Sequence, residues 1–411
     1  MDVVVVGGGA AGFFGALRAA GLGARATLLE AGAEPLAKVA ISGGGRCNVT
    51  HALHDAAAFV AHYPRGAKEL RSVLARFAAK DTMAWFEARG VALKVEADRR
   101  VFPVSDDSAS IVDALLAEAR ALDVDVRARA RPEAVERDGA RFRIALKGGG
   151  TIGADRVLLA TGSSPAGHAL AAKLGHTIVP PVPALFSFVV RDPRLDGLAG
   201  LAVPRVRATL ACDGLKKPVT KEGPLLVTHQ GLSAHAVLRL SAAAARELAA
   251  TRYAAEVAVD FAPDATDDAL RLAADAARAA NPRGTIGAHA FVDTVPRRLW
   301  DRLVAAAGID PATRWSEVPK KGLHDLVGQL KRARFVVSGR GDFREEIVTA
   351  GGVARREVDW TRMESRLVPG LHFAGEILDV DGLTGGFNLQ NAWSTGWVAG
   401  SAMADPVTRG P

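Results

Sequence analysis

Three glycines and a glutamate near the start of the chain have the spacing of a phosphate-binding loop. Gly7, Gly9 and Gly12 form a G-x-G-x-x-G pattern, and Glu30 follows later in the chain. In this pattern the first glycine allows a sharp turn, the second lets the backbone approach a pyrophosphate, and the third lets a helix pack on a strand. A glutamate at this distance holds a ribose hydroxyl and leaves little room for a 2′-phosphate. The pattern predicts a dinucleotide site that disfavours an NADP-type ligand.

Two further glycine-containing segments could reach the same ligand. Ala160–Gly162 ends an apolar run that is typical of a buried strand. Near the other end of the chain, Gly375–Glu376 and Asp381 precede Gly385–Gly386 at the start of a predicted helix. A helix start offers N–H groups and a positive dipole end to an electron-rich group. Each segment alone is also typical of an ordinary loop, but together they predict one long dinucleotide that touches both ends of the chain.

The elements that must position these residues are visible in the hydrophobic pattern. A β-branched run at 3–6, a predicted helix at 10–20 and a second apolar run at 26–30 form a βαβ unit, the opening of a doubly wound sheet. A proline-rich linker is predicted at 179–183, followed by short alternating strands, Ala-rich helices and a return of strands at Phe335. This order indicates an α/β dinucleotide-binding domain interrupted by an inserted β-plus-helical module.

Composition limits the classes of protein that the chain can belong to. Its 411 residues are 49% apolar and carry a formal charge of +7, but the arginines are scattered, so a nucleic-acid partner is unlikely by this criterion. The two cysteines, Cys47 and Cys212, form no disulfide framework or zinc motif, so no metal is expected and a reducing cytoplasm fits. We expect a cytoplasmic protein, because the N-terminus lacks signal-peptide features and its glycines make a poor membrane span.

Six segments, spread over nearly the whole chain, form a more specific pattern. They are Gly7–Gly12 with Glu30, the loop from Lys38 through Ser42-Gly43-Gly44-Gly45-Arg46-Cys47-Asn48, Val101–Ser105, Val348–Val353, Met363–Ser365 and Ala374–Gln390. Together they resemble a bacterial flavoprotein family described as BaiN-like or aminoacetone oxidase-like, which is related to the two-dinucleotide-binding-domain flavoproteins.

This resemblance implies a non-covalently bound FAD in a split Rossmann-like domain. It also implies that the insertion is a β-barrel plus a small helical domain. The expected segments are 1–175 for the first part of the FAD-binding domain, 176–263 for the barrel, 264–335 for the helical domain and 336–411 for the C-terminal part of the FAD-binding domain.

The resemblance also implies which residues bind FAD. Those expected around the ADP half are Gly7, Gly9, Ala10, Ala11, Gly12, Glu30 and Ala31; those expected along the cofactor toward the flavin are Lys38, Gly44, Gly45, Arg46, Cys47 and Asn48. Those expected at the middle are Ala160, Thr161 and Gly162, and those expected at the ribityl chain and ring are Gly375, Glu376, Asp381, Gly385, Gly386, Phe387 and Asn388.

The residues that carry the chemistry are not identified by the sequence. Cys47 beside Arg46 could be a flavin-adjacent thiolate, but a lone cysteine in such a loop is more often a small packing residue. Arg46 could supply a positive charge near the cofactor or anchor the loop. His229 and His235 are possible proton donors, although isolated histidines are more often structural.

The leading hypothesis is an oxidoreductase that transfers hydride between a small-molecule substrate and FAD. The alternatives are an FAD-dependent RNA-modifying enzyme, motivated by the positive charge, and a flavin-binding module without turnover. A nicotinamide or oxygen is the expected electron partner. No second G-x-G-x-x-G occurs between Gly162 and Gly339, so we expect the insertion to cover the substrate rather than to bind a nicotinamide.

Overall fold

A computed structural model describes residues 1–341 and 348–406 of the protein. The chain forms two compact units: unit 1 contains residues 1–182 and 348–411, and unit 2 contains residues 183–347. Unit 1 therefore combines the two ends of the chain, which lie far apart in the sequence.

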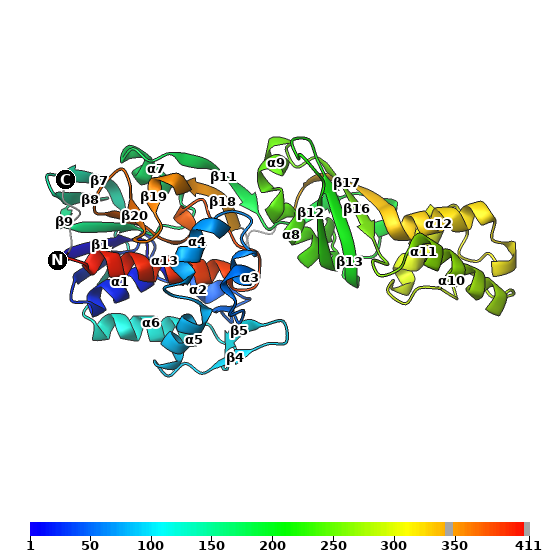
Figure 1. The fold of residues 1–411 in the computed structure, drawn as a ribbon, viewed down its shortest axis with the longest axis horizontal. Helices are drawn as coiled ribbons and strands as arrows, with labels where there is room; N and C mark the ends of the chain where they lie inside the picture. The colour runs from blue at the N-terminus through cyan, green and yellow to red at the C-terminus, as the bar shows by residue number, and fades with distance from the viewer. Residues whose placement is uncertain (342–347, 407–411) are drawn as a thin grey trace. The chain divides into compact units, whose positions relative to one another are not determined.

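A seven-stranded sheet lies at the centre of unit 1, in the order β19-β20-β21-β10-β1-β2-β6 (Figure 1). The five strands from β21 to β6 are parallel, whereas β20 and β19 are antiparallel additions at one edge. The central strand is almost entirely apolar because a parallel strand is covered on both faces. The strands are β1 (Asp2–Val6), β2 (Arg25–Leu29), β6 (Asp125–Arg127), β10 (Arg156–Leu159), β19 (Val358–Asp359), β20 (Glu364–Ser365) and β21 (Leu371–Phe373).

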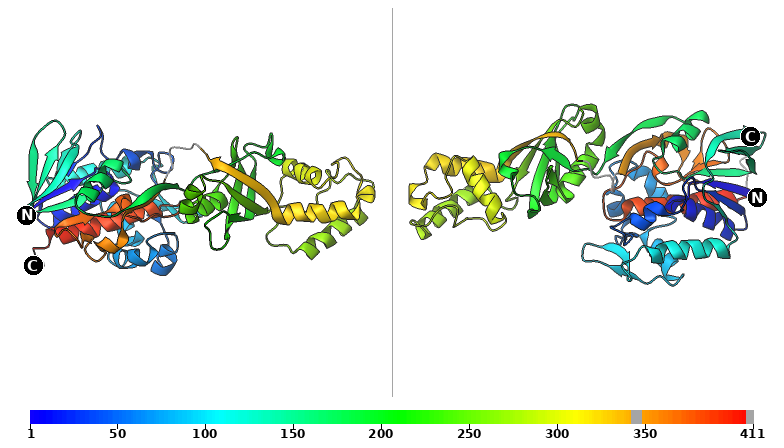
Figure 2. Two further views of the ribbon diagram at one scale, coloured as in Figure 1. Left: turned by 90° about the horizontal axis from the view of Figure 1, so that it is seen from above. Right: turned by 180° about the vertical axis from the view of Figure 1, so that it is seen from behind.

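Helices α1 (Ala10–Gly21) and α13 (Phe387–Ala404) lie side by side in unit 1, one from each end of the chain (Figures 1 and 2). Their backbones come close because glycines face the contact. A Cβ atom at Gly396 would lie 2.4 Å from the carbonyl oxygen of Ala11, and one at Gly400 would lie 2.4 Å from that of Gly15. The C-terminal helix is thus held against the helix that begins at the glycine loop.

Three small sheets complete unit 1, in the orders β7-β8-β9, β3-β5-β4 and β11-β18. Their strands are β3 (Thr50–His51), β4 (Leu93–Val95), β5 (Arg100–Pro103), β7 (Pro132–Asp138), β8 (Arg141–Leu146), β9 (Thr151–Ala154), β11 (Ile178–Ala184) and β18 (Val348–Val353). The remaining helices are α2 (Ala37–Ile41), α3 (Ala56–Val60), α4 (Ala67–Leu74), α5 (Ala79–Glu87), α6 (Ala109–Ala121), α7 (Pro165–Lys173) and the short η3 (Arg355–Glu357) and η4 (Gly375–Ile377).

Unit 2 is built on a closed six-stranded barrel in the order β12-β15-β14-β13-β16-β17. Strand β12 pairs with both β15 and β17, which closes the barrel and leaves no free edge. The strands are β12 (Phe188–Val190), β13 (Ala202–Ala211), β14 (Val219–Val227), β15 (Gly231–Ser233), β16 (Ala255–Asp260) and β17 (Ala333–Arg340), and η1 (Pro193–Leu195), α8 (His235–Ala243) and α9 (Ala245–Ala250) fill the connections.

A helical part is inserted between β16 and β17. It consists of α10 (Asp267–Ala280), α11 (Arg297–Ala306), the short η2 (Trp315–Glu317) and α12 (Lys320–Arg332), and Figure 2 shows α12 leading directly into β17. Its fully buried Trp300 and Trp315 belong to the same apolar cluster as barrel residues such as Phe188. The helices and the barrel therefore share one continuous core.

The expected α/β fold class, with a split Rossmann-like domain and an inserted barrel and helical part, is confirmed. The segment limits differ from the expected ones in two places. The predicted linker at 179–183 lies within strand β11, and the strand pattern that returns at Phe335 belongs to barrel strand β17. An alternating pattern predicts a strand but does not specify its sheet, which is why the expected C-terminal part of the FAD-binding domain includes residues 336–340 of the barrel.

The buried His372 of β21 predicts that the protein loses stability in acid. Burial, the largest effect, lowers the pKa of His372 from 6.5 to about 4, although Glu364 acts in the opposite direction. Between these values the unfolded chain binds a proton that the folded protein does not, so stability falls as the pH falls. The contribution is about 3 kcal/mol. We expect His372→Gln to flatten the dependence of the free energy of unfolding on pH between about 6.5 and 4.

A suitable control is His54→Gln, because His54 is exposed in the same unit. If His372→Gln and His54→Gln change the pH dependence equally, the buried imidazole is not the origin of the acid sensitivity.

Candidate functional site

The glycine loop follows β1 and leads into α1, as the sequence predicts, and its glycines have two different roles. A Cβ atom at Gly7 would lie 2.4 Å from the carbonyl oxygen of Ala160, and one at Gly12 would lie 1.9 Å from that of Gly7. These two glycines are required for the fold. A Cβ atom at Gly9 would meet no protein atom within 4 Å. Gly9 therefore borders open space beside the start of α1, where the first N–H groups lack partners within the helix.

Glu30 lies at the end of β2, directly beside this loop. Its Oε2 accepts a hydrogen bond of 2.8 Å from the Gly8 N–H, and its Oε1 accepts one of 2.5 Å from the Gly32 N–H. A carboxylate has about four acceptor positions, so two remain for a ribose hydroxyl. The adjacent Ala31 is exposed.

Three expected site residues from distant segments meet at a second point. The Lys38 Nζ lies 3.6 Å from the Glu376 Oε2, and the Glu376 Oε1 accepts a hydrogen bond of 3.0 Å from the Thr349 N–H. A Cβ atom at Gly162 would lie 3.7 Å from the Glu376 Oε2 and 3.8 Å from the Lys38 Nζ. Beside them, the Thr161 Oγ1 is buried with no hydrogen-bond partner. These contacts join the segments around 38, 162 and 376.

The loop at 42–48 and the loop at 382–388 are also joined. With its amide oriented to satisfy both groups, Asn48 donates to the Thr50 carbonyl oxygen and accepts from the Gly386 N–H, each at 3.0 Å. Asn388 holds its own loop through hydrogen bonds of 2.8 and 2.9 Å with the backbone of Gly382. Gly44 and Gly45 have left-handed backbones, and a Cβ atom at either would meet nothing within 4 Å.

Open backbone at Gly9, Gly44 and Gly45 is what a large planar and phosphate-bearing ligand requires. We name these open glycines, together with Glu30, the Lys38–Glu376 pair and the loops at 42–48 and 382–388, the cradle. Its residues fit FAD: the start of α1 suits the pyrophosphate, Glu30 suits a ribose, and the loops at 42–48 and 382–388 suit the remainder. Gly375 packs closely against α1, since a Cβ atom there would lie 2.9 Å from the Cβ atom of Ala11.

Two residues of the predicted loop have structural roles. The Arg46 guanidinium lies 3.9 Å from the ring centre of Phe102 and pairs with Glu96 at 2.8 Å and Asp106 at 3.2 Å. These contacts match the loop-anchor interpretation of Arg46. Cys47 is fully buried, and burial raises the pKa of its thiol to about 12. The thiolate interpretation is therefore wrong, and Cys47 is a packing residue.

Asp381, which the resemblance implies meets the ribityl chain and ring, forms a close ion pair within the protein. Its carboxylate is fully buried, and both of its oxygens accept hydrogen bonds of 2.5 Å from Arg65. The structure therefore gives Asp381 a buried protein partner, which the sequence pattern does not reveal.

His51 and His62, which sequence reasoning missed, lie beside the expected site residues. Their rings stack on Phe387 with ring centres at 4.7 and 4.3 Å, and the His51 Nδ1 lies 3.1 Å from the Gly385 carbonyl oxygen. Burial, more than any other effect, lowers the pKa of His51 below its usual value. The only signal in the sequence was the position of His51 three residues after Asn48, at the end of a specific motif.

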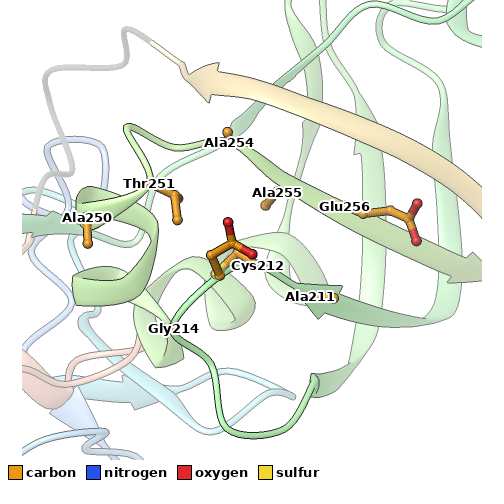
Figure 3. Close-up of a pocket in the computed structure, with 9 residues that line it drawn as sticks. Ala211, Cys212, Gly214, Ala250, Thr251, Ala254, Ala255 and Glu256 are labelled. Atoms are coloured by element: carbon orange, nitrogen blue, oxygen red, sulfur yellow. The ribbon is translucent and has the colours of Figure 1, made fainter.

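His229 and His235, the proton donors considered from the sequence, are exposed residues of unit 2. Unit 2 also contains a pocket of about 630 Å³, lined by Ala211, Cys212, Asp213, Gly214, Ala250, Thr251, Ala254, Ala255 and Glu256 (Figure 3). Burial, with nearby Glu247 and Asp213, raises the pKa of the Cys212 thiol, which disfavours a thiolate in this pocket. None of the expected cofactor-binding residues lines it.

Within residues 1–341 and 348–406, no group of three or more His, Cys, Asp or Glu side chains is placed to hold a metal ion. In the same ranges, no helix has the length and apolar character needed to cross a membrane.

Comparison with known proteins gives matches along almost the whole chain. Residues 1–402 match the family described as "HI0933-like protein Rossmann domain". The chain is 33% identical to the ribosomal RNA dihydrouridine synthase of Escherichia coli K12, with 96% of each protein covered. It is 32% identical to the 3-dehydro-bile acid delta(4,6)-reductase of Clostridium scindens, with 98% of each covered.

Among solved structures, 3-ketosteroid-delta4-(5alpha)-dehydrogenase from Rhodococcus jostii RHA1 superimposes with a TM-score of 0.51 at 17% identity. The match covers 98% of this chain and 96% of that one. At this identity the likeness extends to the fold alone.

Proposed function

Since this chain belongs to the HI0933-like Rossmann-domain family of FAD-binding oxidoreductases, we propose that it is a reductase that adds two hydrogens across a carbon–carbon double bond. The observation that carries FAD binding is the cradle, where a Cβ atom added at Gly9, Gly44 or Gly45 would have no neighbour within 4 Å. The direction of the reaction is inferred from two relatives, the rRNA dihydrouridine synthase and the bile acid reductase, because the names of both enzymes describe a reaction that adds hydrogen to the substrate.

In this proposal each part of the cradle has a distinct task. The start of α1 and Glu30 bind the dinucleotide, while the Lys38–Glu376 pair and the loops at 42–48 and 382–388 hold its other end in position. When bound and reduced by an electron donor, FAD would supply hydride chemistry for one new C–H bond. The other carbon must receive a proton, so the site needs a proton donor.

His51 is the proposed proton donor. Its Nδ1–H donates to the Gly385 carbonyl oxygen, which orients the ring and leaves Nε2 to exchange a proton. We expect His51→Gln to slow substrate reduction by about a hundredfold, the usual scale of general-acid catalysis, without loss of FAD. The rate should also fall as the pH rises through the pKa of His51, which lies below its ordinary value of 6.5. The measurement is the pH profile of single-turnover reduction.

His54→Gln is the control, because His54 is exposed and only three residues away. A His51→Gln protein with an unchanged pH profile would exclude His51 as the donor.

The first candidate for the substrate is a small molecule that contains an electron-poor double bond, such as one conjugated to a carbonyl. RNA is the second candidate, favoured by the name of the 33% identical relative and by the formal charge of +7.

The test compares the two candidates directly. The reduced holoprotein should be mixed without oxygen with a 3-oxo-4-ene steroid and, separately, with a ribosomal RNA transcript. Reoxidation of the flavin with a product heavier by two hydrogens supports the proposal. A flavin that stays reduced with both compounds, with neither compound gaining hydrogen, contradicts it.

A further inference from the structure

A second pocket in unit 1 has a strongly basic lining and lies outside the cradle. Its volume is about 330 Å³, and its lining residues are Lys68, Glu69, Ser72, Arg355, Arg356, Val358, Trp360 and Arg366. None of these residues belongs to the cradle or to the expected FAD-binding set. The pocket is therefore distinct from the site of the FAD pyrophosphate.

Two walls face each other across this basic pocket. One is α4, where Lys68 and Ser72 are four residues apart and so lie on the same face of the helix. The other is formed by η3 and the segment that follows it. There the Trp360 indole N–H donates to the Arg355 carbonyl oxygen at 3.0 Å, and the Arg366 Nε donates to the Val358 carbonyl oxygen at 3.1 Å. These contacts hold the second wall rigid.

The positive charge of the basic pocket exceeds its negative charge. Arg355 is matched by Glu69 at 3.5 Å and Asp379 at 3.4 Å. Lys68 and Arg366 form no ion pair with any residue in the part of the chain that the structure describes. The remaining cation, Arg356, has a side chain that is 77% exposed.

The contact of Arg356 with a carboxylate is weak. Its guanidinium lies 3.6 Å from Oε1 of Glu357, and the other oxygen of Glu357 accepts a hydrogen bond from the Thr177 N–H. Three cations, Lys68, Arg356 and Arg366, are thus available to a ligand.

We propose that this basic pocket binds a phosphate group. Guanidinium groups match phosphate oxygens in pairs and lysine adds a point charge, so three available cations suit a ligand with two negative charges. The volume is sufficient for a phosphate with an attached organic group, for which Val358 and Trp360 offer apolar surface. That group belongs either to a free phosphorylated metabolite or to an RNA backbone.

The test uses the FAD-loaded protein, so that the FAD site is already filled. Titrations with inorganic phosphate, uridine monophosphate and a short single-stranded RNA measure the dissociation constants. For whichever probe binds, we expect Lys68→Gln with Arg356→Gln to raise the dissociation constant about a hundredfold, because each substitution removes a charge-assisted hydrogen bond. Added salt should also weaken binding.

Arg143→Gln is the matched control, because Arg143 is an exposed arginine of unit 1 outside the basic pocket, paired with Glu136 on the β7–β8 hairpin. Binding of the mononucleotide or inorganic phosphate indicates a metabolite, and binding of RNA alone indicates a nucleic-acid backbone. Either result supports the proposal if the double variant loses binding and Arg143→Gln does not. The proposal is overturned if none of the three probes binds, or if the double variant and Arg143→Gln bind the probe equally well. Neither outcome depends on the proposed reductase activity.

Discussion

Replacing Gly9 with valine will give a folded protein that does not retain FAD. The backbone of Gly9 is extended, with φ −90° and ψ −172°, which valine adopts readily. No protein atom lies within 4 Å of the added Cβ, so the fold has room for the side chain. The same space is where the pyrophosphate must approach the start of α1. We expect the affinity for FAD to fall at least about a hundredfold. The measurement is the flavin absorbance of the purified protein, with thermal unfolding as a check on folding.

Two other glycines make this result interpretable. Gly153 on β9 also has no neighbour within 4 Å of an added Cβ, so Gly153→Val should retain FAD. Gly12→Ala should fail to fold correctly, because its Cβ would overlap the Gly7 carbonyl oxygen at 1.9 Å. A Gly9→Val protein that is purified with a full complement of FAD would show that the cradle is not the cofactor site.

Replacing Arg65 with methionine will destabilise the protein by about 3–5 kcal/mol, because it removes the Arg65 countercharge of the buried Asp381 carboxylate. The side chains of this pair are 10% and 0% exposed, and two hydrogen bonds of 2.5 Å join them. Substituting both residues, as Arg65→Met with Asp381→Leu, should recover most of the loss, since the buried charge is then removed as well. The measurement is the free energy of unfolding in urea.

The exposed pair of Arg127 and Asp125 provides the comparison, with side chains 46% and 47% exposed. Arg127→Met should change stability by less than about 1 kcal/mol, because water screens such pairs. If Arg65→Met also costs less than about 1 kcal/mol, the buried pair is not important for stability. The double variant also tests the expected cofactor role of Asp381. If it is stable but free of FAD, Asp381 contacts the cofactor as the resemblance implies.

The sequence alone determined the features that depend on neighbours in the chain. The run from β1 through the glycine loop to α1, and Glu30 at the end of β2, could be predicted because strand periodicity, a sharp turn and a helix start are local properties. The α/β class followed from the same patterns. The resemblance extended these predictions to the loops at 42–48 and 382–388.

Only the tertiary structure decided which partner each polar residue has. Arg46, Cys47 and Asp381 lie in specific motifs, yet their partners or surroundings come from elsewhere: Glu96 and Phe102 for Arg46, a buried core for Cys47, and Arg65 for Asp381. The stacking of His51 on Phe387 also depends on the tertiary structure, because the two residues are 336 positions apart in the sequence. Charge and burial depend on contacts made across the fold, and hydrophobic periodicity carries no information about those contacts.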